Sequence, residues 1–235
     1  MSAAAVFELE STLFRGSSIL SFAGHLGRAG YTHPLETARF VGGRRLRARH
    51  RDAHDDLTLV RGFLALLAGR GQRTMQAHAE RFAQEQLLQL LNPSAVAEIM
   101  SLQFRGVPVL LTTAAPQDLA DAVGQALGLA GSIGTMAHVH EGSYTGRVGS
   151  LVAHGLAKAQ RVADLLAEWN CDPAQCWAFS SSISDLPLLT LVGHPVAVKP
   201  DRALRVAAHA RGWRLLPGSG DRVCPRRRSR VAPLP

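Results

Sequence analysis

The sequence predicts an α/β protein, a doubly wound parallel sheet with an all-helical block inserted after its first strand. Three observations lead to this prediction. A short apolar run at residues 3–7 is typical of a buried strand, and residues 16–91 then show helical periodicity with almost no strand signal. From residue 107 onward, apolar strands alternate with amphipathic helices. Such alternation is typical of a parallel sheet with helices on both faces.

Within the helical block, the spacing of apolar residues predicts helices over residues 19–26 and 57–67, and a longer third helix over residues 75–91. Asn92-Pro93 then interrupts the chain before a helix that ends near Phe104. We therefore expect residues 16–91 to form a helical cap on a discontinuous core made of residues 1–15 and 92–216.

The second part of the chain supplies the rest of the predicted core. A buried parallel strand is expected at residues 107–113, and residues 141–147 suggest a small hairpin or flap. Residues 217–235 are rich in Gly, Pro and Arg without periodicity, so we expect a disordered tail there. The remaining predicted elements are helices at 117–127, 156–169, 184–191 and 201–211 and strands at 176–180 and 195–198.

Composition excludes several classes of protein. The chain has 235 residues, of which 46% are hydrophobic, which fits one medium globular domain with an insertion. No run approaches the roughly 18 apolar residues of a membrane span, so no membrane partner is expected. Glu8 and Glu10 interrupt the N-terminal apolar run, which leaves no signal-like segment and makes the cytoplasm the expected location.

The formal net charge of +8 raises the question of a polyanionic partner. However, Lys158 and Lys199 are the only lysines, and much of the arginine is gathered at residues 44–51 and 226–230. This distribution favours solvated basic faces, and we do not expect nucleic acid as a partner. The three cysteines lack CxxC spacing, which argues against a zinc site or a disulfide framework. The ten histidines form no HExxH or triad-like grouping. His138 and His140 alternate on one strand face, a pattern that fits a metal site or, as we expect, a surface pair on the hairpin. Trp169, Trp177 and Trp213 are interpreted as core or edge residues.

Polar residues follow the predicted core strands where those strands end. Glu8 and Glu10 are two residues apart after the first strand, so they point to the same side, where an open α/β sheet has its ligand crevice. Thr113 ends the next core strand, and a hydroxyl beside helix-terminal amides can bind phosphate. Lys158 offers a compact ammonium in an arginine-dominated chain. Taken singly, the acids could form a solvated turn and Thr113 a helix cap.

The order of four segments favours a shared site. Four segments resemble, in the same order along the chain, the four motifs of the haloacid dehalogenase (HAD) superfamily, in particular its subfamily IB phosphoserine-phosphatase-like branch. These segments are AVFELEST, LLTTAAP, GLAKAQRV and AFSSSISDLPLL. The following VGHPVAVKPD also resembles that branch, so the resemblance covers residues 3–216. It implies a HAD-like Rossmannoid core and an inserted helical cap.

The resemblance also implies a chemistry and a set of roles. A carboxylate attacks phosphorus, a second acid protonates the leaving oxygen, and further carboxylates hold Mg²⁺. The implied ligand is a small phosphorylated metabolite. The resemblance places Glu8 at the nucleophile position and Glu10 at the acid/base position. It implies that Thr113 and Lys158 bind phosphate. The implied metal ligands are Glu8, Glu10, Ser181 and Asp185.

Three family aspartates are replaced here, by Glu8, Glu10 and Ser181. Each Asp-to-Glu change inserts a methylene and moves the carboxylate by roughly 1.5 Å, and a misplacement of about 1 Å can cost on the order of 10²-fold in rate. The leading hypothesis is therefore a pseudophosphatase that still binds a phosphorylated ligand, with a weakened Mg²⁺ site. An active Mg²⁺-dependent phosphomonoesterase is the alternative, and a regulatory module for an acidic partner is a third.

Overall fold

The computed structural model describes residues 2–47 and 54–217. Its centre is a six-stranded parallel sheet with the strand order β3-β2-β1-β6-β7-β8. The chain leaves β1 toward one edge through β2 and β3, and later fills the other edge through β6, β7 and β8, so the predicted doubly wound sheet is confirmed. The strands are β1 Ala5–Glu8, β2 Val109–Pro116, β3 Gly131–Thr135, β6 Trp177–Ser180, β7 His194–Val198 and β8 Arg214–Leu216.

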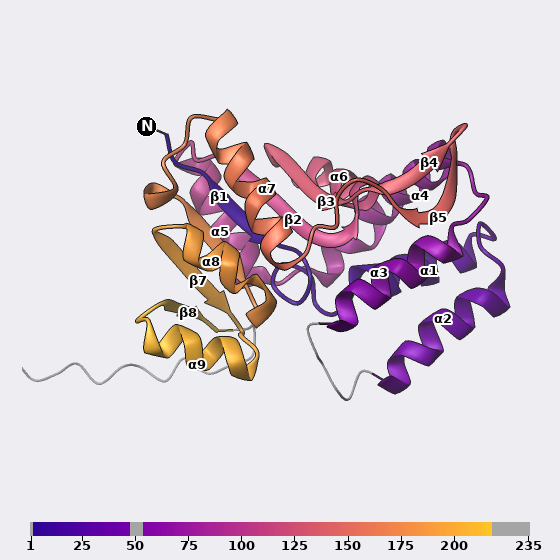
Figure 1. The fold of residues 1–235 in the computed structure, drawn as a ribbon, viewed down its shortest axis with the longest axis horizontal. Coiled ribbons are helices and arrows are strands. Elements are labelled where there is room, and N and C mark those ends of the chain that lie inside the picture. The colour runs from indigo at the N-terminus through magenta and orange to yellow at the C-terminus, as the bar shows by residue number, and fades with distance from the viewer. Residues whose placement is uncertain (1, 48–53, 218–235) are drawn as a thin grey trace, which may run out of the picture.

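Helices cover both faces of the sheet (Figure 1). Phe7 and Phe179 stack with ring centroids 3.9 Å apart on the face that continues into the inserted helices. The alternate residues Val6 and Ala178 point into the core on the other face, as the two-residue period of a strand requires. On the Phe7 side lie α5 Pro93–Phe104 and α6 Gln117–Ala126, and on the other side α7 Gly155–Glu168, α8 Leu186–Leu191 and α9 Arg202–Ala210.

The helices inserted after β1, which we call the cap, are α1 Ser18–Arg28, α2 Pro34–Arg47, α3 His54–Leu66 and α4 Gln72–Glu85. They occupy one end of the molecule, on the right in Figure 1. The predicted single helix over residues 75–91 is wrong at its C-terminal end. At Gln86 the backbone departs from helical angles, with φ at −120°, and a 3₁₀ turn at Leu87–Leu90 follows. Buried Leu87 and Leu91 lie in this returning segment.

The predicted hairpin is present as β4 Ala137–His140 and β5 Ser143–Val148. It attaches to the connection between α3 and α4, and to the first residue of α4, through three backbone hydrogen bonds. Gly69 N donates to Tyr144 O at 2.8 Å, Tyr144 N donates to Arg70 O at 2.9 Å, and Gln72 N donates to Gly142 O at 2.8 Å. The cap is therefore bound to a second segment of the core as well as to β1.

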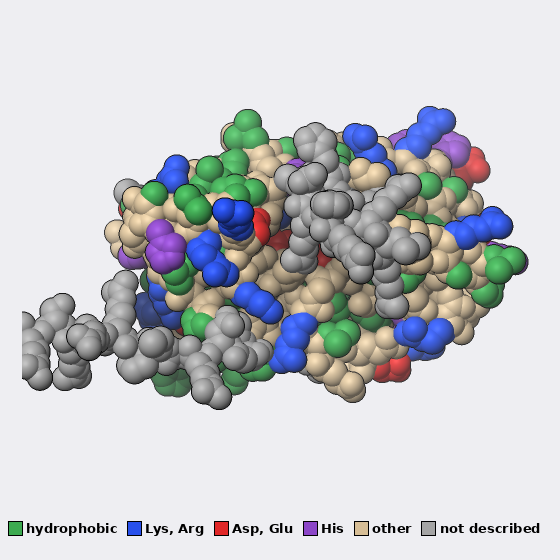
Figure 2. Space-filling model, turned by 90° about the horizontal axis from the view of Figure 1, so that it is seen from below, with side chains coloured by type: hydrophobic (Ala, Val, Ile, Leu, Met, Phe, Trp, Pro, Cys, Tyr) green, Lys and Arg blue, Asp and Glu red, His purple; other side chains and the backbone are tan. Residues whose placement is uncertain are grey.

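Basic side chains occur across much of the face shown in Figure 2, among hydrophobic and polar ones. The side chains of the arginine cluster at residues 44–51 and the tail beyond residue 217 lie outside the described part of the chain. The predicted domain boundaries stay predictions, and so does the predicted disorder of the tail. Within residues 2–47 and 54–217, no helix is both long and apolar enough to cross a membrane.

Candidate active site

The chain makes a tight turn directly after β1, at the carboxyl edge of the sheet. Leu9 N donates to Thr112 O at 2.9 Å and so extends the pairing with β2 by one residue. Phe14 N then donates back to Leu9 O at 2.7 Å. Ser11, inside this turn, has φ at +61°, in the left-handed region that non-glycine residues enter only at a cost. The turn holds residues 8–12 over the ends of the central strands.

Three charged side chains from three distant segments meet beneath this turn. Lys158 Nζ lies 2.9 Å from Asp185 Oδ1 and 3.8 Å from Glu8 Oε1. All three side chains are buried. Among the described residues, Lys158 is the only buried lysine or arginine, which makes it the one cation inside the protein in that part of the chain.

Hydrogen bonds fix the segment that carries Asp185. Ser180 Oγ donates to Asp185 Oδ2 at 2.6 Å. Asp201, at the start of α9, accepts from Ile183 N at 2.8 Å, and its own backbone N donates to Ser181 O at 2.8 Å. The loop after β6 is thus positioned by the loop after β7, so Asp185 is held against Lys158.

The Glu10 side chain is engaged by the cap. Its Oε2 accepts from Ser18 N at 2.8 Å, and its Oε1 accepts from Ser18 Oγ. Ser18 is the first residue of α1, so the carboxylate lies at the positive end of the helix dipole and takes one of the unpaired amides there. Glu10 therefore links the turn after β1 to the first cap helix.

The remaining predicted residues lie at the same edge of the sheet. Ser181 Oγ donates to the backbone carbonyl of Glu10 at 3.3 Å. Thr113 is buried in β2, one residue beyond the partner of Glu8, and its Oγ1 accepts from Ala115 N at 3.0 Å. The structure therefore gathers all six predicted site residues around the ends of β1, β2 and β6 and the start of α7.

Burial dominates the protonation of Glu8. Loss of solvent raises the pKa of its carboxyl well above the ordinary value of 4.5, and the negative charges of Asp185 and Glu10 raise it further. The Lys158 ammonium acts in the opposite direction but is the smaller effect. Burial therefore favours the protonated form of Glu8.

The arrangement does not fit a magnesium ion well. Mg²⁺ requires near-octahedral oxygen ligands and is usually held through one or two carboxylates, with waters completing its shell. Within residues 2–47 and 54–217, no three His, Cys, Asp or Glu side chains converge in a way that could hold a metal. The Ser181 hydroxyl is directed to the Glu10 carbonyl, and Lys158 already neutralises Asp185.

Asp118 attaches the cap to the core beside the site. Its Oδ1 accepts from Gln72 Nε2 at 3.1 Å and from Gln76 Nε2 at 2.7 Å, both on α4. Its Oδ2 accepts from the Tyr144 hydroxyl of β5 at 3.0 Å. Asp118 lies in the first turn of α6, which directly follows β2, so it joins cap, hairpin and core at one carboxylate.

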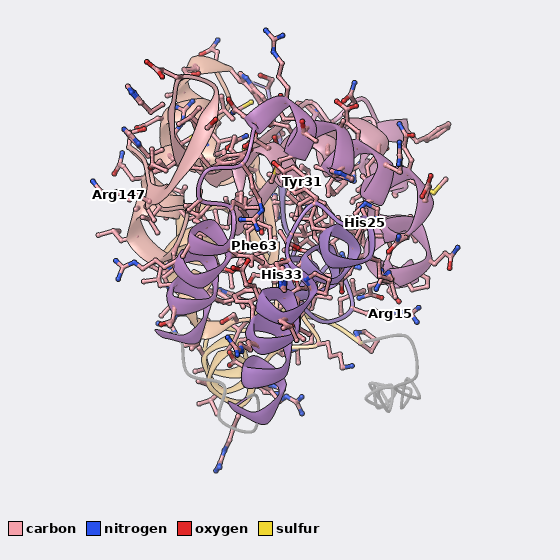
Figure 3. The ribbon with its side chains drawn as sticks, turned by 90° about the vertical axis from the view of Figure 1, so that its right-hand side faces the viewer. Arg15, His25, Tyr31, His33, Phe63 and Arg147 are labelled. Carbon is pink, nitrogen blue, oxygen red and sulfur yellow. The ribbon has the colours of Figure 1, made fainter. Side chains whose placement is uncertain are left out.

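A second attachment lies inside the cap. The Tyr31 hydroxyl donates to Gly71 O at 2.7 Å, and Arg70 Nε donates to Tyr31 O at 2.9 Å, which joins the α1–α2 connection to the α3–α4 connection. Tyr31 and His25 both lie among the cap helices (Figure 3). Both attachments, like the Ser18 contact, depend on side chains that sequence reasoning did not single out. The only signal was the Ser17-Ser18 pair before an apolar helix, a common helix start.

The fold and the site together define a Rossmann-like α/β protein with a helical cap over a buried carboxylate and lysine set at the switch point of the sheet. The model of the haloacid dehalogenase-like hydrolase family matches residues 5–190. The chain therefore belongs to this family, as its motifs predict.

Curated relatives include proteins named as a hydrolase and as a phosphatase. A putative hydrolase of Mycobacterium leprae is 31% identical over 92% of this chain and 72% of that protein. A phosphoserine phosphatase of Mycobacterium tuberculosis is 31% identical over 92% of this chain and 70% of that protein. An "inhibition of morphological differentiation protein" of Streptomyces azureus is 31% identical over 91% of this chain and 77% of that protein.

Solved structures share the fold. A protein of unknown function from Bordetella pertussis superposes with a TM-score of 0.77 at 27% identity, over 92% of this chain and 98% of the other. An apo phosphoserine phosphatase superposes with a TM-score of 0.63 at 16% identity, over 88% of this chain and 90% of the other. The chain is thus a HAD-family, phosphatase-like hydrolase with the Rossmannoid core of that family.

Proposed function

We propose that this protein binds a small phosphorylated metabolite between Lys158 and Thr113 but hydrolyses it poorly, as a pseudophosphatase. The proposal depends on the environment of Glu8, Glu10 and Ser181, the three positions where the family has aspartates. Glu8 has a raised pKa, the Glu10 carboxylate accepts two hydrogen bonds from Ser18, and Ser181 contributes a neutral hydroxyl. Each departs from what phosphoryl transfer to a carboxylate needs.

Binding is supported by the groups that remain. The Lys158 ammonium is buried at the carboxyl edge of the sheet, and Thr113 lies at the same edge, close to the amino end of α6. A helix amino terminus favours an anion, and a buried ammonium attracts one strongly. Protonated Glu8 adds a hydrogen-bond donor and removes a negative charge that would repel phosphate.

Slow turnover is supported by the same geometry. A carboxylate nucleophile must be ionised, whereas burial favours the protonated form of Glu8. A general acid must reach the leaving oxygen, whereas Glu10 is held at α1. Ser181 replaces an anionic ligand, so the charge that would bind Mg²⁺ is reduced.

Calorimetric titration with inorganic phosphate and with O-phospho-L-serine tests the binding half of the proposal. We expect saturable binding by the wild-type protein, and a loss of about tenfold or more in affinity in Thr113→Val and Lys158→Met, since 1.4 kcal/mol corresponds to a factor of ten. Lys199→Met, at the other lysine of the chain, is the matched control and keeps wild-type affinity. Absence of saturable binding by the wild-type protein would contradict the proposal.

The second candidate is an active phosphomonoesterase with Glu8 as nucleophile and Glu10 as acid. It is favoured by relatives that are named as phosphatases at 30–31% identity. In that case Lys158, 3.8 Å from Glu8, would stabilise the transferred phosphoryl group, and Glu10 would have to leave Ser18 during the reaction. A phosphoenzyme trapped by acid quench, and absent in Glu8→Gln, would establish this candidate.

Two further proposals follow from the family. The first is that the ligand is a small metabolite, because the cap covers the carboxyl edge of the sheet. The second is that the protein is located in the cytoplasm. A regulatory module for an acidic partner remains a third reading, and it depends on the arginine clusters at residues 44–51 and 226–230. Binding of a polyanion that weakens steeply with salt would support it.

A further inference from the structure

A cavity lies away from the candidate active site. It has a volume of about 620 Å³ and is formed where β6, β7 and β8 begin, whereas the active site lies where the strands end. This volume falls within the range of roughly 300–1,000 Å³ typical of sites for small molecules. Three of its lining residues, Leu189, Val192 and Val196, are apolar and buried.

The walls of the cavity are aromatic. Trp177 and His194 stack with ring centroids 4.8 Å apart, and Arg105 Cζ lies 5.3 Å from the centroid of the Trp177 ring. Trp213, on the other side, carries the guanidinium of Arg211 over its ring, with Cζ 5.5 Å from the centroid. Because His194, Arg105 and Arg211 already lie over these rings, a planar aromatic ligand would contact the indoles edge-on, an arrangement that aromatic pairs favour.

The rim of the cavity is basic. Arg211 and Arg214 both line it, and no Asp or Glu occurs among the described residues that do so. Arg214 is neutralised by Glu98, to which its Nη1 donates at 3.1 Å. Arg211 takes part in none of the ion pairs recorded for residues 2–47 and 54–217, so its charge remains available to an anion.

The backbone presents Arg211 and Trp213 together. Gly212, between them, has φ at +67°, a conformation that glycine adopts without strain. It makes the tight turn from α9 into β8 that places both side chains along the same cavity. The guanidinium is thus preorganised by its contact with the indole, which reduces the entropy that a ligand would have to overcome.

We propose that this cavity is a binding site for a small aromatic anion, with the ring beside Trp213 and the acid group on Arg211. The site is separate from the proposed phosphate site and does not depend on it. An aliphatic anion would lose the ring contacts, and a neutral aromatic would lose the contact with Arg211.

The reporter for this site is 8-anilinonaphthalene-1-sulfonate, an aromatic anion whose fluorescence rises in an apolar pocket and can be excited through nearby tryptophan. We expect saturable binding to the full chain, with the dissociation constant raised about tenfold or more in Arg211→Ala and in Trp213→Ala. Arg211→Glu should weaken binding further. Naphthalene-2-carboxylate should displace the reporter, whereas cyclohexanecarboxylate and 2-naphthol should not.

Two variants serve as matched controls. Arg202→Ala removes an exposed arginine at the opposite end of α9, and Trp169→Phe alters a tryptophan that does not line this cavity. Both should bind the reporter within about twofold of wild type, a difference well below 1.4 kcal/mol. Unchanged affinity in both Arg211→Ala and Arg211→Glu would overturn the proposal. Arg211 is exposed, so its substitution should leave the fold intact. The two Arg211 variants therefore test the proposal even if Trp213→Ala fails to fold.

Discussion

The ammonium of Lys158 and the carboxylate of Asp185 form a buried ion pair, with Nζ 2.9 Å from Oδ1 and the two side chains 3% and 2% exposed. They come from α7 and from the 3₁₀ turn at Ile183–Asp185, segments that meet only in the folded protein. Desolvation of two charges is compensated only when the pair is complete and well bonded. Removing either partner would therefore leave an uncompensated charge buried beside Glu8.

Removing the Lys158 ammonium should lower the free energy of unfolding, because the buried carboxyl groups lose their counterion. Lys158→Met leaves Asp185 and Glu8 without their counterion, and breaking a buried pair in this way costs about 3–5 kcal/mol. Urea denaturation at pH 7.5 measures the loss. Lys199→Met, at the exposed second lysine, should change the free energy of unfolding by less than about 0.5 kcal/mol. Similar stability of the two variants would show that the pair has no energetic role.

Glu8→Gln should stabilise the protein at alkaline pH. The folded-state pKa of Glu8 lies above its unfolded value, so the stability that this group contributes is present below pH 4.5 and is lost as pH rises through the folded pKa. Glutamine does not titrate. The melting temperature of Glu8→Gln should therefore exceed that of wild type at pH 8, and the difference should shrink toward pH 5. A lower melting temperature for Glu8→Gln at pH 8 would mean that attraction to Lys158 outweighs desolvation.

The contact between Glu10 and Ser18 should appear as coupling in a double-mutant cycle. Loss of a side chain that caps a helix amino terminus costs about 0.5–2 kcal/mol. We expect Glu10→Gln and Ser18→Ala each to destabilise within this range, and the double variant to lose less than their sum, because they remove the same interaction. Glu80→Gln, on an exposed position of α4, is the control. Strict additivity would place the Glu10 carboxylate elsewhere in solution.

Asp118→Ala should loosen the attachment of the cap. The change removes the acceptor of Gln72, Gln76 and the buried Tyr144 hydroxyl, and leaving buried donors unsatisfied costs about 1–3 kcal/mol. Hydrogen exchange should show faster exchange in α4 and β5, with α7 unchanged. Asp164→Ala, which removes a single acceptor from an exposed pair on α7, is the matched control. Unchanged protection of α4 in Asp118→Ala would rule out this role.

The cap should lose stability in mild acid through His25. Burial, the main cause, together with His78 and Arg28, lowers the pKa of His25 below 6.5. The unfolded chain then takes up the proton first, so stability is fully present above pH 6.5 and falls as pH decreases toward the folded pKa. Urea denaturation at pH 7.5 and at pH 5.5 checks this. In His25→Gln the decrease should be smaller, and an equal decrease would assign the effect to other groups.

The sequence was sufficient for most of the sheet, and the elements it missed share a physical reason. β3 has the sequence GSIGT, with too few apolar residues to show a pattern, and β8 is only three residues long. α2 has few apolar positions and leads into the arginine cluster, so it lacks the periodicity that revealed its neighbours. These elements form because neighbouring strands and helices cover them.

The candidate site likewise contains features that depend on tertiary packing and leave no local pattern in the sequence. Motif order was enough to place Glu8, Lys158 and Asp185 together, because parallel strands bring their carboxyl ends to one edge. The orientation of Glu10 depends on where α1 begins in space, and that is set by packing within the cap. The aromatic cavity was equally hidden, since Trp177 and Trp213 are far apart in the sequence and were interpreted only as core or edge residues.

The most direct test of poor turnover compares the wild-type protein with the variant Glu8→Asp, Glu10→Asp, Ser181→Asp in hydrolysis of p-nitrophenyl phosphate and O-phospho-L-serine, with MgCl₂ present. We predict no release of phosphate above background by the wild-type protein and measurable turnover by the triple variant, whose carboxylates regain the length and number typical of the family. Robust turnover by the wild-type protein, abolished by Glu8→Ala, would contradict the proposed pseudophosphatase.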